Sequence, residues 1–355
     1  MVLATPKEAS TTAASWPSGP GMIYLAMSPW AGMWRNRHQL MSRFSRDIPV
    51  LYVEPASKLK RLRKEGSPVR RILSSVGEST LAPVTQQLYR FTSPEYLTVS
   101  GHGSLGQWSH RRWLRAVRRA AREIGIRYPV LWLSIPAQSD CAGQLDECLS
   151  IYHIVDEYAG YTLVDEVRRE RLARDEQRLF SAVDLSVVVS HELLEAKSEG
   201  NRSVFLVENA VDYDAFRQAT DKGETPDDMS DLPSPRIGYS GLIGNRLDLE
   251  LIEHLARERP SWSIVLIGKV DSRRCEDEMD RLRGLRNVHF LGQKDVSDVP
   301  SYVAALDVGL LPYRVNVETT HISPLKMYEY FAAGLPVVST RIPSAARRGD
   351  LVSLA

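Results

Sequence analysis

Short apolar runs alternate with amphipathic segments along most of the chain, and this alternation limits the fold more than any other feature. It is typical of a parallel sheet covered by helices, because parallel strands need long crossover connections. In the first half of the chain the predicted strands are 22–28, 50–54, 88–92, 130–135, 151–155, 185–190 and 204–207. The predicted helices between them are 33–46, 109–124 and 162–180.

A polar stretch at 217–235 interrupts the alternation with Pro, Gly and acidic residues, as linkers do. The pattern then resumes, with predicted strands 237–240, 264–267, 288–291, 308–311 and 337–340 and predicted helices 248–257, 275–283, 301–305 and 324–333. We therefore predict an α/β protein with two Rossmann-like, doubly wound lobes, 21–216 and 236–355, that face a central cleft. Residues 1–20 are predicted to form a disordered tail.

Composition is that of an ordinary enzyme and excludes several classes of function. The 355 residues are 43% hydrophobic, enough for two cores. A formal net charge of +1 gives no overall field that would favour nucleic acid. The three cysteines form no CxxC pair, which favours a reducing, cytoplasmic compartment. No apolar run approaches the roughly 20 residues that span a bilayer.

Three strands of the predicted second lobe end in glycine. Gly241 and Gly244 follow the first of them and precede Arg246, while Gly268-Lys269 and Gly292-Gln293 follow the next two. Glycine lets the backbone approach a ligand closely, and an arginine can neutralise a phosphate. Because open parallel sheets bind ligands beyond the carboxyl ends of their strands, we expect a ligand site here.

The stretch HISPLKMYEYFAAGLPVVST, at 321–340, predicts a short helix before a buried strand. Ser323 and Pro324 are typical of a helix start, and Gly334 of its end. Lys326 and Glu329 share one face at about 100° per residue. The free N–H groups of the first turn, near Leu325, suit a phosphate together with Lys326, and Glu329 suits a pair of sugar hydroxyls.

These motifs resemble those of GT-B glycosyltransferases, specifically family 4 (glycosyl transferases group 1) and its teichuronic-acid-type members. The resemblance is carried by SPLKMYEYFAAGLPVVST, IGYSGLIGNRLDLELI, NVHFLGQKDVSDVPSYVAALDVGLLPY, VFLVENAVDYDAF and SPWAGMWRNRHQLMSRFSRDIPVLYVEP, and covers residues 21–355. Members of the family usually continue with further helices, so the resemblance implies a chain that is short at its C-terminus, with an incomplete second lobe.

By this resemblance the chain is a hexosyltransferase-type enzyme that moves a sugar, with retention, from a nucleotide-sugar to a glycan or lipid-linked acceptor in cell-surface polysaccharide synthesis. The donor would be a UDP- or GDP-sugar. Glu329 would hold its ribose, and its diphosphate would be held by Arg246, Lys326 and the N–H groups after Ser323. The loop at Gly292-Gln293 would border the nucleobase. No metal or other cofactor is expected, and Asp227-Asp228, in the linker, is interpreted as solvated.

Two positions depart from the family pattern. His321 stands where the family often has a glutamate eight residues before Glu329, and Asp156 lacks the preceding histidine of many relatives. We predict that His321 contacts the donor sugar and that Asp156 either accepts the proton of the acceptor hydroxyl or orients that hydroxyl. His153 is predicted to be a core residue. The expected acceptor-side residues are Gly32, Arg37, His38 and Glu157. A nucleotide-sugar epimerase and a degenerate, non-catalytic nucleotide-sugar-binding relative stay open as alternatives.

One helix of the first lobe is unusually basic. Residues 111–127 contain seven arginines and one glutamate. The arginines opposite its apolar stripe are Arg112, Arg115, Arg118, Arg119 and Arg122. This pattern is explained by a packed helix with a solvated face, but together with the basic run at 58–64 it also predicts docking on the anionic inner face of the cell membrane. Nucleic acid is not expected as a partner, because no aromatic platform accompanies the arginines.

Overall fold

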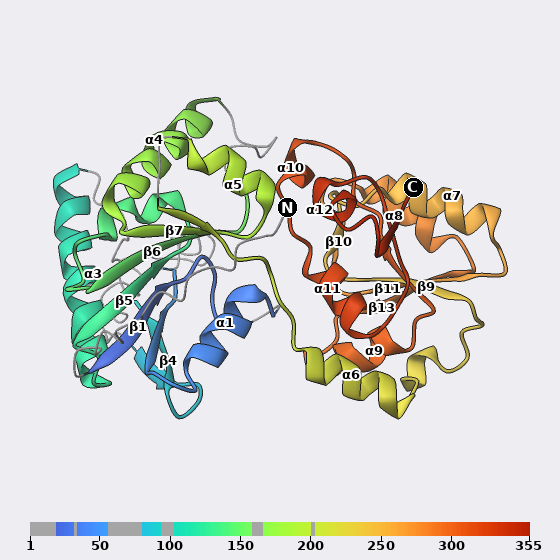
Figure 1. The fold of residues 1–355 in the computed structure, drawn as a ribbon, viewed down its shortest axis with the longest axis horizontal. Coiled ribbons are helices and arrows are strands. Elements are labelled where there is room, and N and C mark those ends of the chain that lie inside the picture. The colour runs from blue at the N-terminus through green and yellow to red at the C-terminus, as the bar shows by residue number, and fades with distance from the viewer. Residues whose placement is uncertain (1–18, 32–33, 56–79, 94–102, 158–165, 200–202) are drawn as a thin grey trace, which may run out of the picture. The chain divides into compact units, whose positions relative to one another are not determined.

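The computed structural model describes residues 19–31, 34–55, 80–93, 103–157, 166–199 and 203–355, and the fold is α/β (Figure 1). Nearly all of the predicted tail, together with Gly32 and the basic run at 58–64, lies outside the described residues. Every predicted strand has a counterpart within one or two residues of its expected position, except that the first begins at Pro20 and ends at Leu25. The predicted α/β class is confirmed.

The first sheet contains eight described strands in the order β3-β4-β2-β1-β5-β6-β7-β8. The strands are β1 (Pro20–Leu25), β2 (Val50–Val53), β3 (Thr80–Pro83), β4 (Leu88–Thr92), β5 (Tyr128–Leu133), β6 (Leu149–Ile154), β7 (Leu185–Val188) and β8 (Val204–Leu206). The helices are α1 (Asn36–Phe44), α3 (Gly103–Glu123), α4 (Glu166–Ala182) and α5 (His191–Ser198). Strand β3 pairs antiparallel with β4, and the sequence did not predict it because it has no buried residue.

The second sheet is entirely parallel, in the order β13-β11-β9-β14-β15-β16. Its strands are β9 (Arg236–Ser240), β11 (Ser263–Ile267), β13 (Val288–Gly292), β14 (Val308–Leu311), β15 (Val337–Ser339) and β16 (Val352–Leu354), and β10 (Ile243–Gly244) pairs with β12 (Val270–Asp271) in a separate two-stranded sheet. The carboxyl ends of its parallel strands therefore lie at one edge.

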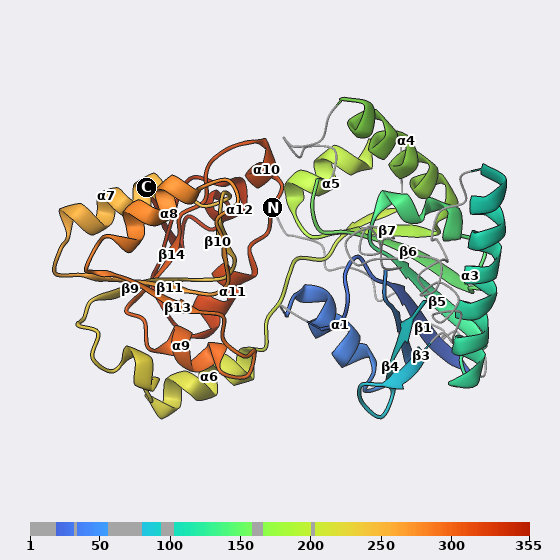
Figure 2. The same ribbon diagram turned by 180° about the vertical axis from the view of Figure 1, so that it is seen from behind.

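Helices cover both faces of the second sheet. They are α6 (Tyr213–Lys222), α7 (Leu249–Glu258), α8 (Glu276–Arg283), α9 (Val299–Ala304), α10 (Val317–Thr320), α11 (Leu325–Ala332) and α12 (Pro343–Ala346). Both ribbon views place α7 and α8 on one face and α6 and α9 on the other (Figures 1 and 2). All five residues of β11 are buried, as expected for a central strand covered on both sides.

Two glycines allow helices to pack directly on this sheet. A Cβ atom at Gly309, in β14, would lie 2.4 Å from the ring of Tyr330, and one at Gly238, in β9, would lie 2.5 Å from Leu306. The ring of Tyr330 is fully buried against this backbone, and its hydroxyl accepts a hydrogen bond of 3.0 Å from the Ser240 N–H. Tyr330 thus fixes α11 beside the carboxyl end of β9.

By their contacts the residues group into two compact units. The first comprises Met1–Gly32, Arg37–Ile151 and Ala182–Asp184, and the second comprises Met33–Asn36, Tyr152–Ser181 and Leu185–Ala355. The first part of the predicted linker is helical, because α6 continues to Lys222 and ends there with Gly223 in the left-handed conformation. The predicted domain boundaries and the predicted cleft stay predictions.

Candidate functional site

Three glycine turns meet at the carboxyl edge of the second sheet. The Gly268 N–H donates to the Gly292 carbonyl, and the Gly241 N–H donates to the Ile267 carbonyl, both at 2.8 Å. A Cβ atom at Gly268 would lie 1.8 Å from the Gly241 carbonyl oxygen, and its φ of +143° also favours glycine. The predicted strand-end loops therefore form one continuous surface of backbone, with Lys269 and Gln293 exposed beside it.

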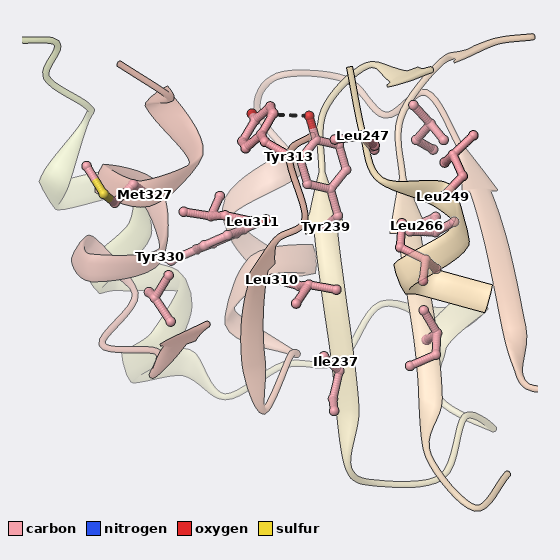
Figure 3. Close-up of a cluster of buried hydrophobic side chains, with 14 of the residues drawn as sticks. Ile237, Tyr239, Leu247, Leu249, Leu266, Leu310, Leu311, Tyr313, Met327 and Tyr330 are labelled. Atoms are coloured by element: carbon pink, nitrogen blue, oxygen red, sulfur yellow. Dashed lines mark hydrogen bonds between the residues drawn. The ribbon is translucent and has the colours of Figure 1, made fainter. Parts of the chain in front are cut away.

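Helix α11 begins one residue later than predicted. Its N-cap is Pro324, and no side chain caps it, so the prediction that Ser323 caps the helix is wrong. The Ser323 hydroxyl lies 3.4 Å from that of Tyr328 instead. The helix is held by its apolar face, where Met327 and Tyr330 are fully buried near Leu311 (Figure 3). Its opposite side therefore presents Lys326 and Glu329, as the periodicity predicted.

Lys326 and Glu329 neutralise each other in this structure. The ammonium lies 3.1 Å from both carboxylate oxygens of Glu329. The side chains are 23% and 13% exposed, so both are reachable from solvent but partly shielded. Two groups of opposite charge, each expected to bind a different part of one ligand, are thus held within one turn.

Arg246 and Asp156 form a second ion pair among the predicted residues. The guanidinium lies 3.4 Å from the carboxylate, and the two side chains are 36% and 19% exposed. They are 90 residues apart in the sequence. The backbone carbonyl of Arg246 accepts a hydrogen bond of 3.0 Å from the Arg314 N–H, which fixes the loop after β9.

Tyr313 is a buried residue that forms an isolated β-bridge with Leu247, the residue after Arg246. Its hydroxyl is 3.5 Å from that of Tyr239, and the dashed line in Figure 3 marks this contact. Burial raises the pKa of Tyr313, and the charge of Glu329 adds to this effect. The Tyr239 hydroxyl and the charge of Arg246 lower the pKa by less, so the net pKa is raised. Both tyrosines are buried, at 3% and 8% exposed for Tyr239 and Tyr313.

His321 follows α10 and precedes the residues that lead into α11. Its carbonyl accepts a hydrogen bond of 2.8 Å from the Ser190 hydroxyl, and the Ser323 carbonyl accepts one of 2.7 Å from the Asn209 amide. The Nδ1 atom of His321 is buried without a hydrogen-bond partner among the described residues. Ser190 and Asn209 thus position the segment that carries His321.

The carboxylates that follow β6 have different surroundings. Glu157 lies 2.7 Å from the ammonium of Lys197, which also binds Glu176 at 2.8 Å. Burial lowers the pKa of Lys197, but the charges of Glu176 and Glu157 outweigh it, so the net pKa is raised. Tyr152 donates to Glu176 at 2.9 Å. Glu157 is thus held in a structural network, whereas its neighbour Asp156 faces Arg246.

The expected acceptor-side histidine is a core residue. His38 is 1% exposed, and its Nε2 lies 3.1 Å from the Trp30 carbonyl, so contact between His38 and an acceptor is contradicted. The ring packs beside Trp30 and Tyr52. Arg37 is partly exposed and donates from Nε to the Tyr52 hydroxyl at 3.2 Å, and it also contacts the Ser28 hydroxyl. His153 is buried as predicted, and burial lowers its pKa to about 4.

Two further expectations can be compared with the structure. Asp227 and Asp228 are exposed, as their interpretation as solvated requires, and Asp228 also pairs with Lys294 and accepts a hydrogen bond from Tyr302. Burial alone would raise the pKa of Asp228, but the contacts with Lys294 and Tyr302 lower it. Within the described part of the chain, no group of three or more His, Cys, Asp or Glu side chains could hold a metal ion.

Four of the five predicted arginines of α3 are exposed, and Arg118 is half-buried. Arg122 pairs with Asp146 at 3.1 Å, and the guanidinium of Arg112 lies 4.7 Å from the centre of the exposed Trp108 ring. Helices long and apolar enough to cross a membrane are not found among the residues that the structure describes.

Sequence reasoning missed three residues of the site. Tyr313 follows β14 in an apolar stretch, and Ser190 and Asn209 act through the backbone of 321–323. None of them carries a charge or stands in a repeated spacing. Asn209 lies in the segment VENAVD, shortly after the apolar run that forms β8, and its position after that strand is the available signal.

Two α/β sheets, of which the second is entirely parallel and carries the predicted ligand-binding residues at its carboxyl edge, define the class, and the fold is that of the GT-B proteins. The structure is similar to sucrose-phosphate synthase from Thermosynechococcus elongatus, with a TM-score of 0.66 and 15% identity over 94% of this chain and 85% of that one. It is also similar to HepE from Anabaena, solved with UDP and glucose, with a TM-score of 0.64 and 17% identity over 96% and 86%.

The sequence comparisons identify the family that part of the chain resembles. Residues 235–352 match the family model described as Glycosyl transferases group 1. Over 193 residues the chain is 30% identical to the putative teichuronic acid biosynthesis glycosyltransferase TuaH of Bacillus subtilis, covering 52% of this chain and 47% of TuaH. The resemblance to group 1 glycosyltransferases is thus confirmed, and the chain spans about half the length of this curated relative.

Proposed function

We propose that this chain is a glycosyltransferase. It would transfer a sugar from a nucleotide-sugar donor to a hydroxyl of a glycan or lipid-linked acceptor in cell-surface polysaccharide synthesis. The observation that carries the proposal is that α11, with Lys326 and Glu329, packs beside the carboxyl end of β9, which leads into the glycine turn and Arg246. Two cations suit a diphosphate, and a carboxylate suits the ribose hydroxyls.

The chemistry follows from these charges. The bond between the anomeric carbon and the diphosphate oxygen breaks, and the diphosphate leaves with the electron pair. Arg246, Lys326 and the N–H groups at the start of α11 stabilise its developing charge. The acceptor oxygen bonds to the anomeric carbon. For a retaining reaction the proton of the acceptor hydroxyl passes to the departing diphosphate, and Asp156 orients that hydroxyl.

We further propose that the reaction requires no metal ion, because Arg246 and Lys326 supply the positive charge that a divalent cation would otherwise give the leaving group. UDP-sugars are the first donors to test, since HepE was solved with UDP and glucose. GDP-sugars are the next. TuaH, by its name, acts in teichuronic acid biosynthesis, which supports a cell-surface polysaccharide as the product.

The basic face of α3 supports a place of action at the inner face of the cell membrane. Arg112, Arg115, Arg119 and Arg122 are exposed on one helix, next to the exposed ring of Trp108. Each basic residue near an anionic leaflet contributes about 1 kcal/mol to binding. A lipid-linked acceptor would be reached from there.

The decisive experiment is a thermal-shift screen of the purified chain against UDP-, GDP-, ADP- and dTDP-sugars, with and without EDTA. Binding to the folded state raises the apparent stability by mass action, by about 2.7 kcal/mol at a hundred times Kd. An increase in Tm with one nucleotide class that EDTA does not change is the expected result. An increase that EDTA abolishes would contradict metal independence, and no increase would contradict the donor site.

Glu329→Ala tests the assignment at a single residue. We expect the variant to fold and to bind the same nucleotide-sugar more weakly by about tenfold, because the hydrogen bonds from the ribose to a charged group are lost. Glu250→Ala, an exposed glutamate in the first turn of α7, is the matched control. Sugar transfer by the wild-type chain distinguishes an enzyme from a degenerate relative, in which binding would persist without turnover.

A further inference from the structure

A cavity of about 260 Å³ lies apart from the Arg246 and Glu329 ion pairs. Its lining comes from the first turn of α5, from α12 and from single residues between them, including Glu192, Glu208, Ser323, Ser344, Arg347 and Arg348. The volume is slightly below the range of about 300–1,000 Å³ that is usual for drug-sized ligands, so a single ring is the appropriate size. Nothing in the proposed donor contacts above uses this cavity, although Ser323 borders both.

The charged residues of the lining form balanced pairs. Arg347 binds Glu192 at 2.8 Å, and Arg348 binds both oxygens of Glu208 at 3.0 and 2.8 Å. Arg347, Arg348 and Glu208 are about two-fifths exposed, so they form the rim, whereas the Glu192 side chain is 10% exposed and lies deeper. Two positive and two negative charges give these four residues no net charge, which is compatible with a neutral ligand.

Two polar atoms of the buried lining lack partners. The Oε2 atom of Glu192 and the Oγ atom of Ser344 are buried without a hydrogen-bond partner among the described residues, and Ser344 as a whole is 8% exposed. Buried polar atoms are normally satisfied, so these two atoms keep hydrogen-bonding capacity that a ligand group can use once their side chains turn toward the cavity. The carboxylate oxygen only accepts, whereas the serine hydroxyl can donate or accept.

We infer that this cavity is a subsite for one neutral sugar ring. A ligand hydroxyl donates to Glu192 Oε2 and another accepts from Ser344 Oγ, and the arginines and Glu208 at the rim offer donors and an acceptor to further hydroxyls. A nucleobase fits less well, because the described lining has no Phe, Tyr or Trp on which it could stack and offers one ring, the imidazole of His191. The choice of a sugar rests on the proposed function.

The sugar could belong to the donor or to the acceptor, and the same measurement distinguishes them. Titration calorimetry and saturation-transfer NMR of the full chain would use methyl glycosides of glucose, galactose, mannose and N-acetylglucosamine as probes. A glycoside that competes with the intact nucleotide-sugar but not with the nucleoside diphosphate occupies the donor sugar's place. A glycoside that binds together with the nucleotide-sugar occupies the acceptor's place.

Two variants test the residues. Glu192→Gln should weaken binding of the glycoside by at least about tenfold. In the variant the amide oxygen pairs with Arg347, so an NH₂ donor stands where the wild-type chain has the acceptor Oε2. Ser344→Ala should have a similar effect by removing the hydroxyl. Glu195→Gln is the matched control, since Glu195 also contacts Arg347, at 3.4 Å, but is 75% exposed and does not line the cavity. Binding of the nucleoside diphosphate should be unchanged in all three.

The outcomes separate this inference from the proposed function. If the wild-type chain binds a nucleoside diphosphate but none of the glycosides, the subsite is wrong and the donor site stands. If glycosides bind and both Glu192→Gln and Ser344→Ala retain wild-type affinity, the sugar lies elsewhere and the inference is overturned. If no nucleotide binds but a glycoside binds and both variants lose it, the subsite stands and the glycosyltransferase proposal fails.

Discussion

At the scale of single residues, the candidate site is held in a self-neutralised state. Asp156 pairs with Arg246, and Glu329 pairs with Lys326, so each cation proposed to bind phosphate already has a carboxylate partner. Partly exposed ion pairs of this kind contribute only about 0–1 kcal/mol. A diphosphate, with its higher charge and several oxygens, can therefore replace the carboxylates at little cost.

The Asp156→Asn variant tests this competition. Because Arg246 loses a charged partner, the affinity for the nucleoside diphosphate should rise by up to about fivefold. Sugar transfer should fall, since the group proposed to orient the acceptor is gone. Calorimetry with the diphosphate and a transfer assay give the two values, and Asp146→Asn, which breaks the exposed pair with Arg122, is the control. Unchanged or weaker diphosphate binding would contradict the competition.

His153 gives a prediction for the pH dependence of stability. Burial lowers its pKa in the folded state from the ordinary value of 6.5 to about 4. As the pH falls from 6.5 to 4, the unfolded chain therefore takes up a proton that the folded chain does not, and stability is lost, by up to about 3 kcal/mol. Above pH 6.5 this contribution is fully present.

Urea unfolding of the wild-type chain and of His153→Gln between pH 4 and pH 7.5 measures the effect. The difference in unfolding free energy between the two proteins should change with pH in that window, because the variant cannot titrate there. Carboxylates that titrate near pH 4 affect both proteins equally. A pH-independent difference would show that His153 is protonated alike in both states.

At the scale of elements, the glycine turns connect the sheet to the site. Gly268 leaves room for only a hydrogen, since its Cβ position lies 1.8 Å from the Gly241 carbonyl oxygen. The turn after β11 must therefore move if a side chain is added, and the turn after β9 moves with it. The loop that carries Arg246 depends on this contact.

Gly268→Ala should destabilise the fold by about 3 kcal/mol or more, through the overlap and the unfavourable φ of +143°. Gly349→Ala is the control, because its nearest neighbour, the Ala346 carbonyl oxygen, is at 3.4 Å. That variant should change the unfolding free energy by less than about 1 kcal/mol. Chemical denaturation of both variants provides the comparison, and equal effects would contradict the close approach.

Element prediction from the sequence succeeded where burial and local pattern agree. Every predicted strand is present, in most cases because buried parallel strands form continuous apolar runs. Strand β8 is an apolar run without a buried residue. Strand β3 was missed because none of its residues is buried. The prediction that Ser323 caps α11 was wrong because the N-cap position is occupied by Pro324. The Ser323 carbonyl instead accepts a hydrogen bond from Asn209. Local sequence cannot specify that distant contact.

At the scale of the whole molecule, the basic face of α3 yields a prediction about membranes. Replacing Arg115, Arg118 and Arg119 by Glu should abolish flotation with vesicles that contain phosphatidylserine or phosphatidylglycerol, because three attractive charges become repulsive. High salt should weaken flotation of the wild-type chain.

The control variant has three arginines of α4, Arg168, Arg169 and Arg174, replaced by Glu. It should float with the vesicles as the wild-type chain does. Circular dichroism of both triple variants verifies that they fold. Undiminished flotation of the α3 variant, or equal loss in the α4 variant, would contradict a specific basic surface on α3.

The sequence by itself determined the α/β class, the positions of the strands, the glycines at their ends and the helix that presents Lys326 and Glu329. Those features depend on burial, backbone conformation and spacing, which neighbouring residues specify. The tertiary structure decided that Asp156 meets Arg246, that His38 is buried rather than exposed to an acceptor, and that Glu192 and Ser344 line one cavity. These contacts join side chains far apart in the chain, so only the packed fold specifies them.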